Sequence, residues 1–427
     1  MSDPALTAAS GARECPVCGA TVATRVYEQR FALEDHATRI AGYEVVCCGS
    51  CGAVYASGIP AQAVLDAYYR ESSRYEYLET SGEQPQWQVR WHADVADSVS
   101  RLVPDLSARI VDIGCANADL LGMLKERGYR NVLGVDPAPG SVIAAAALHG
   151  VRVVQGDVFS LPKDAADADF VILSAVLEHI RDLRRALFEV VASLRPTGLL
   201  FVEVPDLGRF PDCVVPPFQQ FSLEHVNYFT MRSLANAMAA VGLACVSEWP
   251  ALRLVGSVEE PSICAVFRPA PDAPRTLEPD GSGLRAVREY VAASAEQERR
   301  VEARIRALVD ERVPLILWGV GTHALHLLAT TPLADAEIVA LVDANPRLHG
   351  LRVGRWTVGG PESVASRSEA LLICSPLRQA EIAAMAREKY GMPNRIVALY
   401  ESGREVSEMP AEDGRAGHVR SSAGNGR

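Results

Sequence analysis

The pattern of apolar and polar positions alternates between strand-like runs and helical stretches over the middle of the chain. Within residues 109–268, short apolar runs recur, and each ends on a small or an acidic residue. These runs occupy residues 108–114, 132–136, 151–157 and 169–174. Strands that alternate with helices are typical of a parallel sheet covered by helices. The pattern therefore predicts an α/β fold with a Rossmann-like sheet.

Breaks in this pattern divide the chain into segments. Residues 269–283 are rich in proline and polar side chains, which is typical of a linker. The last residues lack apolar periodicity, and we expect them to be disordered. The predicted segments are a cysteine-rich module at 13–58, an α/β domain at 61–268 with 61–103 as its helical lead-in, the linker at 269–283, a second Rossmann-like α/β domain at 284–402 and a tail at 403–427.

Charge narrows the possible partners. The chain has 427 residues, of which 42 are basic and 53 acidic, so its formal net charge is -11. A nucleic-acid-binding protein needs a basic face, so this balance argues against a nucleic-acid partner. No apolar run of about 18 residues occurs, which predicts no membrane span. The first residues lack the basic and apolar regions of a secretory signal, so we expect a cytoplasmic protein.

Two Cys-x-x-Cys-Gly turns lie in the cysteine-rich module. They contain Cys15 and Cys18 in one turn and Cys48 and Cys51 in the other. Four thiolates suit a tetrahedral zinc ion and leave no open position, so the predicted zinc is structural. Cys47 competes as a ligand, but Cys48 preserves the symmetry of the two turns. The alternative is a set of thiols without metal.

Four strand ends of the α/β domain carry residues suited to a nucleotide-like ligand. In a parallel sheet these ends meet at one edge, where Gly114, Asp136, Asp157 and Ser174 would border one crevice. Small residues let the backbone approach a ligand, Asp136 can accept both ribose hydroxyls, and Asp157 can accept an adenine amine. A glycine loop alone is shared by many nucleotide binders, so a nicotinamide dinucleotide is the alternative ligand.

In this order the four strand ends resemble the class I S-adenosylmethionine (SAM)-dependent methyltransferases. The family motif, acid-x-Gly-x-Gly-x-Gly, matches Asp112 and Gly114, whereas Ala116 and Ala118 replace two glycines. Residues 194–206 look like the fifth strand of the family. The resemblance implies SAM as cofactor, bound by Asp112, Gly114, Cys115, Ala116, Asn117, Asp136, Pro137, Asp157, Val158 and Ser174.

A Glu-His pair followed by aromatic residues lies beyond that strand, at Glu224 and His225. Histidine can accept a proton at neutral pH. This loop and the cysteine turns resemble the three-domain C-methyltransferases of deoxysugar biosynthesis. The resemblance implies that His225 is a base, with Glu224, His179 and Tyr228 beside it. Ser222 departs from the family, which has tyrosine there.

The second α/β domain repeats the design with a Gly-x-Gly loop at Gly319 and Gly321 and an acidic strand end at Asp343. This loop is either a ligand site or a tight turn. Residues 372–376 depart from the sugar C-methyltransferases, which have Trp-Asn there, and look more like a domain of glycan-biosynthesis methyltransferases. We therefore expect the second domain to serve as a scaffold on the substrate side.

Together, these features predict an enzyme that methylates a nucleotide-linked keto-sugar, a small molecule, at carbon. The alternatives are O-methylation of a sugar or glycan hydroxyl and a non-catalytic scaffold that binds SAM or a nucleotide. In the first case, His225 removes a proton beside the keto group and His179 or Tyr228 steadies the enolate oxygen.

Overall fold

The computed structural model describes residues 13–33, 40–71, 86–255, 258–272 and 275–400. The predicted tail at 403–427 lies outside the described residues, as do residues 273–274 of the predicted linker. The described residues form three sheets of four, seven and six strands. The expected α/β fold with a Rossmann-like sheet is confirmed.

The four-stranded sheet joins two distant parts of the chain. It is antiparallel and consists of β1 (Ala23–Arg30), β2 (Gly42–Cys48), β3 (Val54–Ser57) and β9 (Asn227–Tyr228). Its fourth strand comes from the Glu-His loop region, since Val54 pairs with Tyr228 and Tyr55 pairs with Asn227. The cysteine-rich module and the predicted catalytic loop therefore share one sheet.

The seven-stranded sheet has the order β10-β11-β8-β7-β4-β5-β6. The strands from β8 to β6 run parallel, and the β10–β11 hairpin adds two antiparallel strands. The strands are β4 (Arg109–Ile113), β5 (Asn131–Asp136), β6 (Val153–Gln155), β7 (Ala168–Ser174), β8 (Leu194–Pro205), β10 (Leu243–Val255) and β11 (Val258–Pro269).

Helices cover both faces of this sheet because its central strands are apolar on both sides. On one face, Ile110 packs with α3 (Gln86–Leu102) and α4 (Asp119–Glu126). On the other face, Val111 packs with α6 (Leu183–Ser193) and α7 (Met231–Ala240). The remaining helices here are α1 (Gln62–Glu71) and α5 (Pro139–His149).

The six-stranded sheet follows a long helix, α8 (Gly281–Asp310), which Asp280 caps through the backbone N–H groups of Ser282 and Gly283. The sheet has the order β14-β15-β13-β12-β16-β17. Its elements are β12 (Leu315–Trp318), α9 (Thr322–Thr330), β13 (Ile338–Val342), β14 (Arg352–Val353), β15 (Trp356–Gly359), β16 (Ala370–Ile373), α10 (Gln379–Glu388) and β17 (Ile396–Val397).

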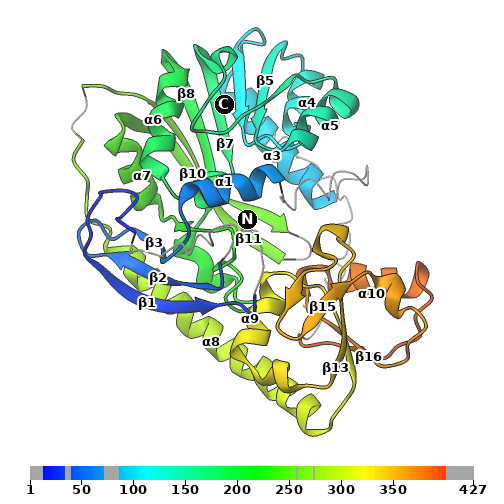
Figure 1. Ribbon diagram of the computed structural model, residues 1–427. Coiled ribbons are helices and arrows are strands. Elements are labelled where there is room, and N and C mark those ends of the chain that lie inside the picture. Colours follow the sequence, from blue (N-terminus) through cyan, green and yellow to red (C-terminus); the bar gives the residue numbers. More distant parts are fainter. Residues whose placement is uncertain (1–12, 34–39, 72–85, 256–257, 273–274, 401–427) are drawn as a thin grey trace, which may run out of the picture.

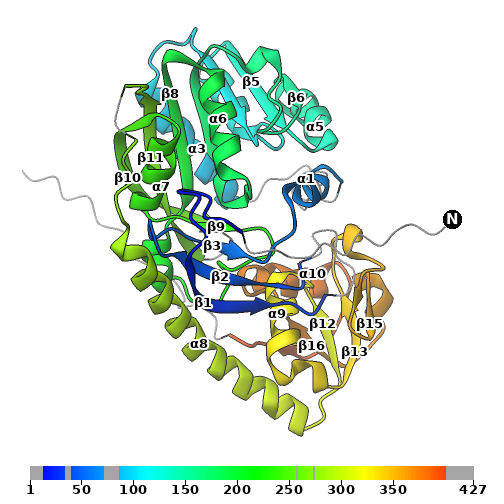
Figure 2. The same cartoon turned by 60° about the vertical axis from the view of Figure 1, so that its left-hand side comes forward.

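The four-stranded sheet lies between the two larger sheets, and α8 runs along the outside of all three parts (Figure 1, Figure 2). One apolar core continues from β1 through the loop after β8 to α8 and β12. The backbone N–H of Ala32 also donates to the carbonyl of Leu325. Of the described helices, none is long and apolar enough to cross a membrane.

Candidate active site

The strand order of the seven-stranded sheet reverses between β4 and β7, and ligands of such sheets bind at this point, outside the carboxyl ends. Gly114 directly follows β4, and its φ of +80° favours glycine. A Cβ atom there would lie 2.7 Å from Cγ2 of Val176, in the loop after β7. The predicted glycine turn therefore borders the loop that follows β7.

Asp136 ends β5 and holds the glycine loop in shape. Its carboxylate accepts backbone hydrogen bonds from Ala116 and Ala138, each at 2.9 Å. A carboxylate has about four acceptor sites, so Asp136 can still accept ribose hydroxyls. Ala116 and Ala118 stand where the family has glycine, and both have left-handed backbones with φ 47° and 64°. Alanine in this region costs about 1–2 kcal/mol.

The other predicted cofactor residues lie around the same turn. Asp112 is buried, and this burial, together with Asp136, raises its pKa to about 7. Asn117 is also buried, and among the described residues its Oδ1 has no hydrogen-bond partner. Cys115 is buried, whereas the carbonyl of Pro137 accepts a hydrogen bond from the Gln155 side chain. The groups of this loop that can bind a ligand are thus its backbone atoms and the buried side-chain amide of Asn117.

Asp157 follows β6 and shapes its own turn. Its Oδ1 accepts hydrogen bonds from the backbone N–H of Phe159 and from the hydroxyl of Ser160, both at 2.9 Å. Val158, beside it, is buried. The turn leaves Asp157 half-buried at the same edge as Asp136, as the parallel register of β5 and β6 requires.

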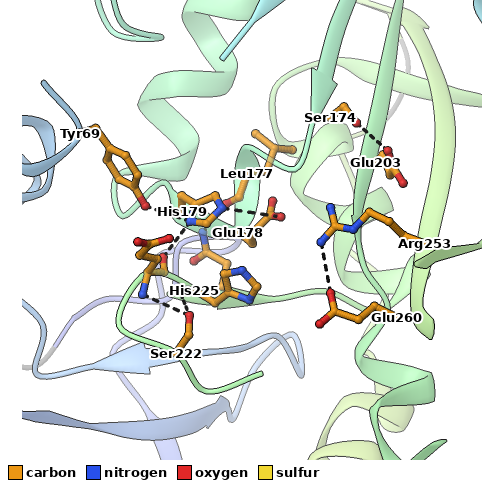
Figure 3. Close-up of polar contacts among 12 residues, drawn as sticks. Tyr69, Ser174, Leu177, Glu178, His179, Glu203, Ser222, His225, Arg253 and Glu260 are labelled. Carbon is orange, nitrogen blue, oxygen red and sulfur yellow. Dashed lines mark hydrogen bonds and ion pairs between the residues drawn. The ribbon is translucent and has the colours of Figure 1, made fainter. Parts of the chain in front are cut away.

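Two histidines meet below this edge, as Figure 3 shows. His179 belongs to a short 3-10 helix, η2 (Leu177–His179), and His225 to the loop before β9. Their ring centroids are 5.0 Å apart in an edge-to-face arrangement. His179 is buried, whereas His225 is half-buried. The structure therefore brings together the two predicted catalytic histidines.

Glu224 and Tyr228 point elsewhere. The carboxylate of Glu224 accepts a hydrogen bond from Tyr68 at 2.6 Å, and its backbone carbonyl lies 3.1 Å from Nδ1 of His179. The hydroxyl of Tyr228 donates to the hydroxyl of Tyr43 or the carbonyl of His225, and its side chain is only 2% exposed. Tyr228 thus supports the loop from the side of the four-stranded sheet.

A buried arginine ties this loop to the cysteine-rich module. The guanidinium of Arg13 donates to the carbonyl of Val226 and to Oδ1 of Asn227, as well as to the carbonyl of Ala56. The backbone N–H of Ala56 donates back to the carbonyl of Val226. Burial lowers the pKa of Arg13 to about 9. The position of His225 therefore depends on the N-terminal sheet.

A polar wall that the sequence pattern did not predict lies across from the histidines (Figure 3). Glu203, on β8, accepts hydrogen bonds from Ser174 at 2.5 Å and from the indole of Trp91 at 2.7 Å. The signal in the sequence was an acid inside the apolar run at residues 199–204. Ser174, predicted to contact the cofactor, is thus oriented by Glu203.

Arg253 and Glu260 complete this wall from the β10–β11 hairpin. They face each other in the strand register and form an ion pair of 3.2 Å, with both side chains about one-tenth exposed, at 11% and 10%. The Arg253 guanidinium also lies over the Trp91 ring, 4.7 Å from its centroid. These two residues are neighbours only because of the register of the hairpin, and the pattern along a single strand does not predict their pairing.

Glu178 is the most enclosed acid of the site. It is 1% exposed, and neither carboxylate oxygen has a hydrogen-bond partner among the described residues. Burial raises its pKa to about 8; its own backbone N–H and Arg253 oppose this rise, and Glu203 and Glu260 add to it. Donor atoms of Glu178, His179 and His225 lie within 4.8 Å of one another, a set that could also hold a metal ion.

The four predicted cysteine ligands form a second cluster. Their sulfur atoms lie within 4.8 Å of one another, with 3.6 Å between Cys15 and Cys51 and 3.5 Å between Cys18 and Cys48. Around a tetrahedral zinc ion, sulfurs lie about 3.8 Å apart. Cys47 is outside the cluster, and its thiol faces the carbonyl of Gly52. The arrangement fits a closed four-sulfur site.

Comparison with known proteins gives a family for the middle of the chain. Residues 87–248 match the model of a methyltransferase domain family. This matched region includes the glycine loop, Asp136, both histidines and Glu203. The N-terminal and C-terminal sheets lie mostly outside the match.

Two curated relatives of the chain are named as methyltransferases. C-methyltransferase NovU of Streptomyces niveus is 27% identical over 273 residues, which cover 60% of this chain and 63% of that protein. Trans-aconitate 2-methyltransferase of Azoarcus sp. strain BH72 is 30% identical over 131 residues, which cover 28% of this chain and 51% of that protein. The chain therefore spans about half of the length of the second relative and less than two thirds of the length of the first.

Among solved structures, a 1,6-didemethyltoxoflavin-N1-methyltransferase of Burkholderia thailandensis resembles the chain with a TM-score of 0.40 and 17% identity. The similarity covers 51% of this chain and 96% of that one.

Proposed function

We propose that this protein is a SAM-dependent methyltransferase that methylates a nucleotide-linked keto-sugar at carbon, with His225 as the base. The observation that carries this proposal is the half-buried His225 beside His179 at the carboxyl edge of the methyltransferase sheet. The similarity to NovU, a C-methyltransferase, favours carbon over oxygen as the methylated atom.

The residues at this edge of the sheet fit SAM. Asp136 would accept the ribose hydroxyls, Asp157 would accept the adenine amine, and the turn from Gly114 to Asn117 would hold the methionine portion. When bound, SAM supplies an electrophilic methyl carbon to the electron pair of the acceptor atom. The protein must place that acceptor in line and create its electron pair.

His225 performs the second task. A neutral imidazole nitrogen accepts a proton from the carbon beside the keto group, and the C–H electron pair becomes that of an enolate. The loop that carries His225 is fixed by strand pairing and by the buried Arg13, so the base is held rigidly. Positioned proton transfer of this kind contributes about 10²–10⁴ in rate.

We further propose that the cysteine cluster holds a structural zinc ion. The donor set supports this, since four thiolates at these separations leave no open position for a substrate. The Cys51 carbonyl accepts a hydrogen bond from the backbone of Asp280, which caps α8. Zinc would therefore fix the four-stranded sheet and the start of α8 together.

The test uses the full chain, methyl-labelled SAM and a panel of nucleotide-linked keto-sugars. We expect one member to gain a labelled methyl group on carbon, located by NMR. The proton beside its keto group should exchange with deuterated solvent. A label on oxygen without such exchange would instead establish O-methylation, with His225 deprotonating a hydroxyl. Binding of SAM without transfer to any member would contradict the proposal.

A further inference from the structure

A chain of three side chains leads from helix α1 into the interior beside the histidines. Tyr69 is half-buried on α1, and its hydroxyl oxygen lies 2.9 Å from Nδ1 of His179. The other ring nitrogen of His179, Nε2, lies 3.9 Å from Oε1 of Glu178. Figure 3 shows the three residues in this order, with His225 beside them. None of these contacts involves a predicted cofactor residue.

The hydrogen bonds assign the tautomer of His179. Nδ1 lies 3.1 Å from the backbone carbonyl of Glu224, which can only accept, so Nδ1 carries the hydrogen. The Tyr69 oxygen then accepts from the same N–H, and the Tyr69 hydroxyl directs its own hydrogen elsewhere. In neutral His179, Nε2 therefore presents a lone pair toward Glu178. This lone pair can accept a hydrogen bond but cannot donate one. The form of Glu178 that matches it is therefore the protonated acid, whose O–H can donate to Nε2.

The surroundings of Glu178 favour the same form. Its carboxyl is enclosed and accepts no hydrogen bond from another described residue, while its own backbone N–H favours the ionised form and opposes the effect of burial. The charged and titratable groups around it are His179 on its own turn, His225 on the loop before β9, Glu203 on β8, Arg253 on β10 and Glu260 on β11. Arg253, the cation of this group, is paired with Glu260. Burial and the two other acids hold the pKa of Glu178 near 8.

We propose that Glu178 is the proton source of a Tyr69–His179–Glu178 relay that protonates the substrate oxygen while His225 removes the carbon-bound proton. This inference rests on the proposed function and adds the residues that neutralise the developing enolate. Tyr69 is the member that would touch the substrate. His179 and Glu178 act through it as positioning residues.

The relay conserves every proton. The O–H bond of Glu178 breaks and its proton passes to Nε2 of His179. The Nδ1 proton passes to the Tyr69 oxygen, whose own proton passes to the substrate oxygen. Glu178 ends as a carboxylate, while His179 and Tyr69 remain neutral. When the keto group re-forms, the same steps run backward. The 3.9 Å gap must shorten for transfer, which is common for catalytic contacts in the absence of substrate.

The first test needs no substrate. Infrared spectra of the full chain, Glu178→Gln and the exposed-site control Glu189→Gln are recorded across neutral and alkaline pH. We expect the difference between wild type and Glu178→Gln to show a protonated-carboxyl band at pH 7, half lost near the pKa of about 8. Subtraction removes the band of Asp112, whose pKa is about 7. A difference spectrum without this band at pH 7 would overturn the proposal.

The second test separates the relay from a merely structural role. With a keto-sugar that the enzyme methylates, Glu178→Gln and Tyr69→Phe should each lower kcat about 10²-fold, with SAM affinity unchanged. Wild-type kcat should fall as pH rises through about 8, and this fall should be absent in Glu178→Gln. An unchanged alkaline fall would refute the relay.

Metal analysis supplies a third outcome. We expect one zinc per chain in wild type and in Glu178→Gln. A second metal ion that is lost in Glu178→Gln would overturn the relay, because that ion would occupy the place of the proton. Failure of methyl transfer to every keto-sugar would contradict the proposed function alone, since the infrared band does not depend on it.

Discussion

The seven-stranded and six-stranded sheets of this molecule use the same loop design and differ in what surrounds it. In the seven-stranded sheet, Asp136 accepts hydrogen bonds from the backbone of Ala116 and Ala138. In the six-stranded sheet, Asp343 accepts them from Val320 and Asn345, each at 2.8 Å. In both sheets the strand order reverses beside the glycine loop. The local chemistry of the two loops is therefore nearly the same.

The difference lies at the neighbouring strand end and the following helix. After β7, the first sheet presents η2 with His179, and His225 lies beside it. In the second sheet, the helix after the glycine loop turns His323 and His326 inward, where His323 bonds Tyr400 and His326 pairs with Glu298 at 2.6 Å. Burial lowers the pKa of His323 to about 3. The glycine loop and its acid thus form the same turn in both sheets, whereas the residues at the neighbouring strand ends determine whether histidines are available for catalysis.

The largest expected effect concerns the sheet that holds His225. Cys48→Ser should release zinc and lower the free energy of unfolding by several kcal/mol, since structural zinc contributes on the order of 10 kcal/mol. Methyl transfer should be lost while the six-stranded sheet keeps its protection from hydrogen exchange. Zinc content and hydrogen exchange by mass spectrometry measure this. Cys47→Ser, outside the cluster, should retain zinc, and loss of zinc there would refute the assigned ligands.

The next effect separates the histidines of the two sheets. His225→Ala should lower turnover by about 10²–10⁴ with SAM affinity kept. His326→Ala should instead lower stability by about 2 kcal/mol, through loss of the Glu298 bond, with turnover per folded molecule unchanged. Steady-state kinetics and chemical denaturation distinguish these outcomes. Near-normal turnover in His225→Ala would remove His225 from the mechanism.

A smaller effect follows from the buried acid of the crevice. Burial raises the pKa of Glu178 from 4.5 to about 8, so the folded protein holds a proton that the unfolded chain releases between these values. Stability should therefore fall as pH rises across this window, by up to about 1.4 kcal/mol per pH unit. Urea denaturation at several pH values measures this, and the stability of Glu178→Gln should fall less steeply with pH than that of wild type. If the free energy of unfolding of Glu178→Gln changed with pH as much as that of wild type, Glu178 would be ionised in the folded state.

The smallest effect contrasts the two glycine loops. Ala116 has φ 47° in the first loop, so Ala116→Gly should relieve strain and raise stability by up to about 1 kcal/mol, with SAM affinity retained. In the second loop, Gly319→Ala should lower stability by about 1–2 kcal/mol, since φ is +96° and a Cβ atom would lie 3.1 Å from that of Ser375. Thermal denaturation measures both changes in stability. If Ala116→Gly lowered stability, the backbone of Ala116 would not be strained.

Local patterns predicted much of this architecture. The strand ends at Gly114 and Asp136 and the two cysteine turns follow from short-range signals, because each depends on a strand or a turn read along the chain. The pairing of His179 with His225, by contrast, was expected only from the family resemblance. Helix α8 begins at Gly281, three residues before the expected start, since Asp280 caps it inside the predicted linker.

Long-range contacts account for what the sequence did not predict. Tyr69 and His179 are 110 residues apart, and Arg13 and Val226 are 213 apart. Arg253 meets Glu260 only through the hairpin register. No periodicity encodes such pairings. Tyr228 illustrates the limit of a motif, because its aromatic side chain matches a family position while its hydroxyl is held by the four-stranded sheet.

Calorimetric titration of SAM into three proteins tests the central claim that the seven-stranded sheet alone holds the cofactor. The proteins are wild type, Asp136→Ala and Asp343→Ala. We predict one SAM per chain, an affinity lowered about 10²-fold in Asp136→Ala, and wild-type affinity in Asp343→Ala. Two SAM molecules per chain, or a loss of affinity in Asp343→Ala equal to that in Asp136→Ala, would contradict the account.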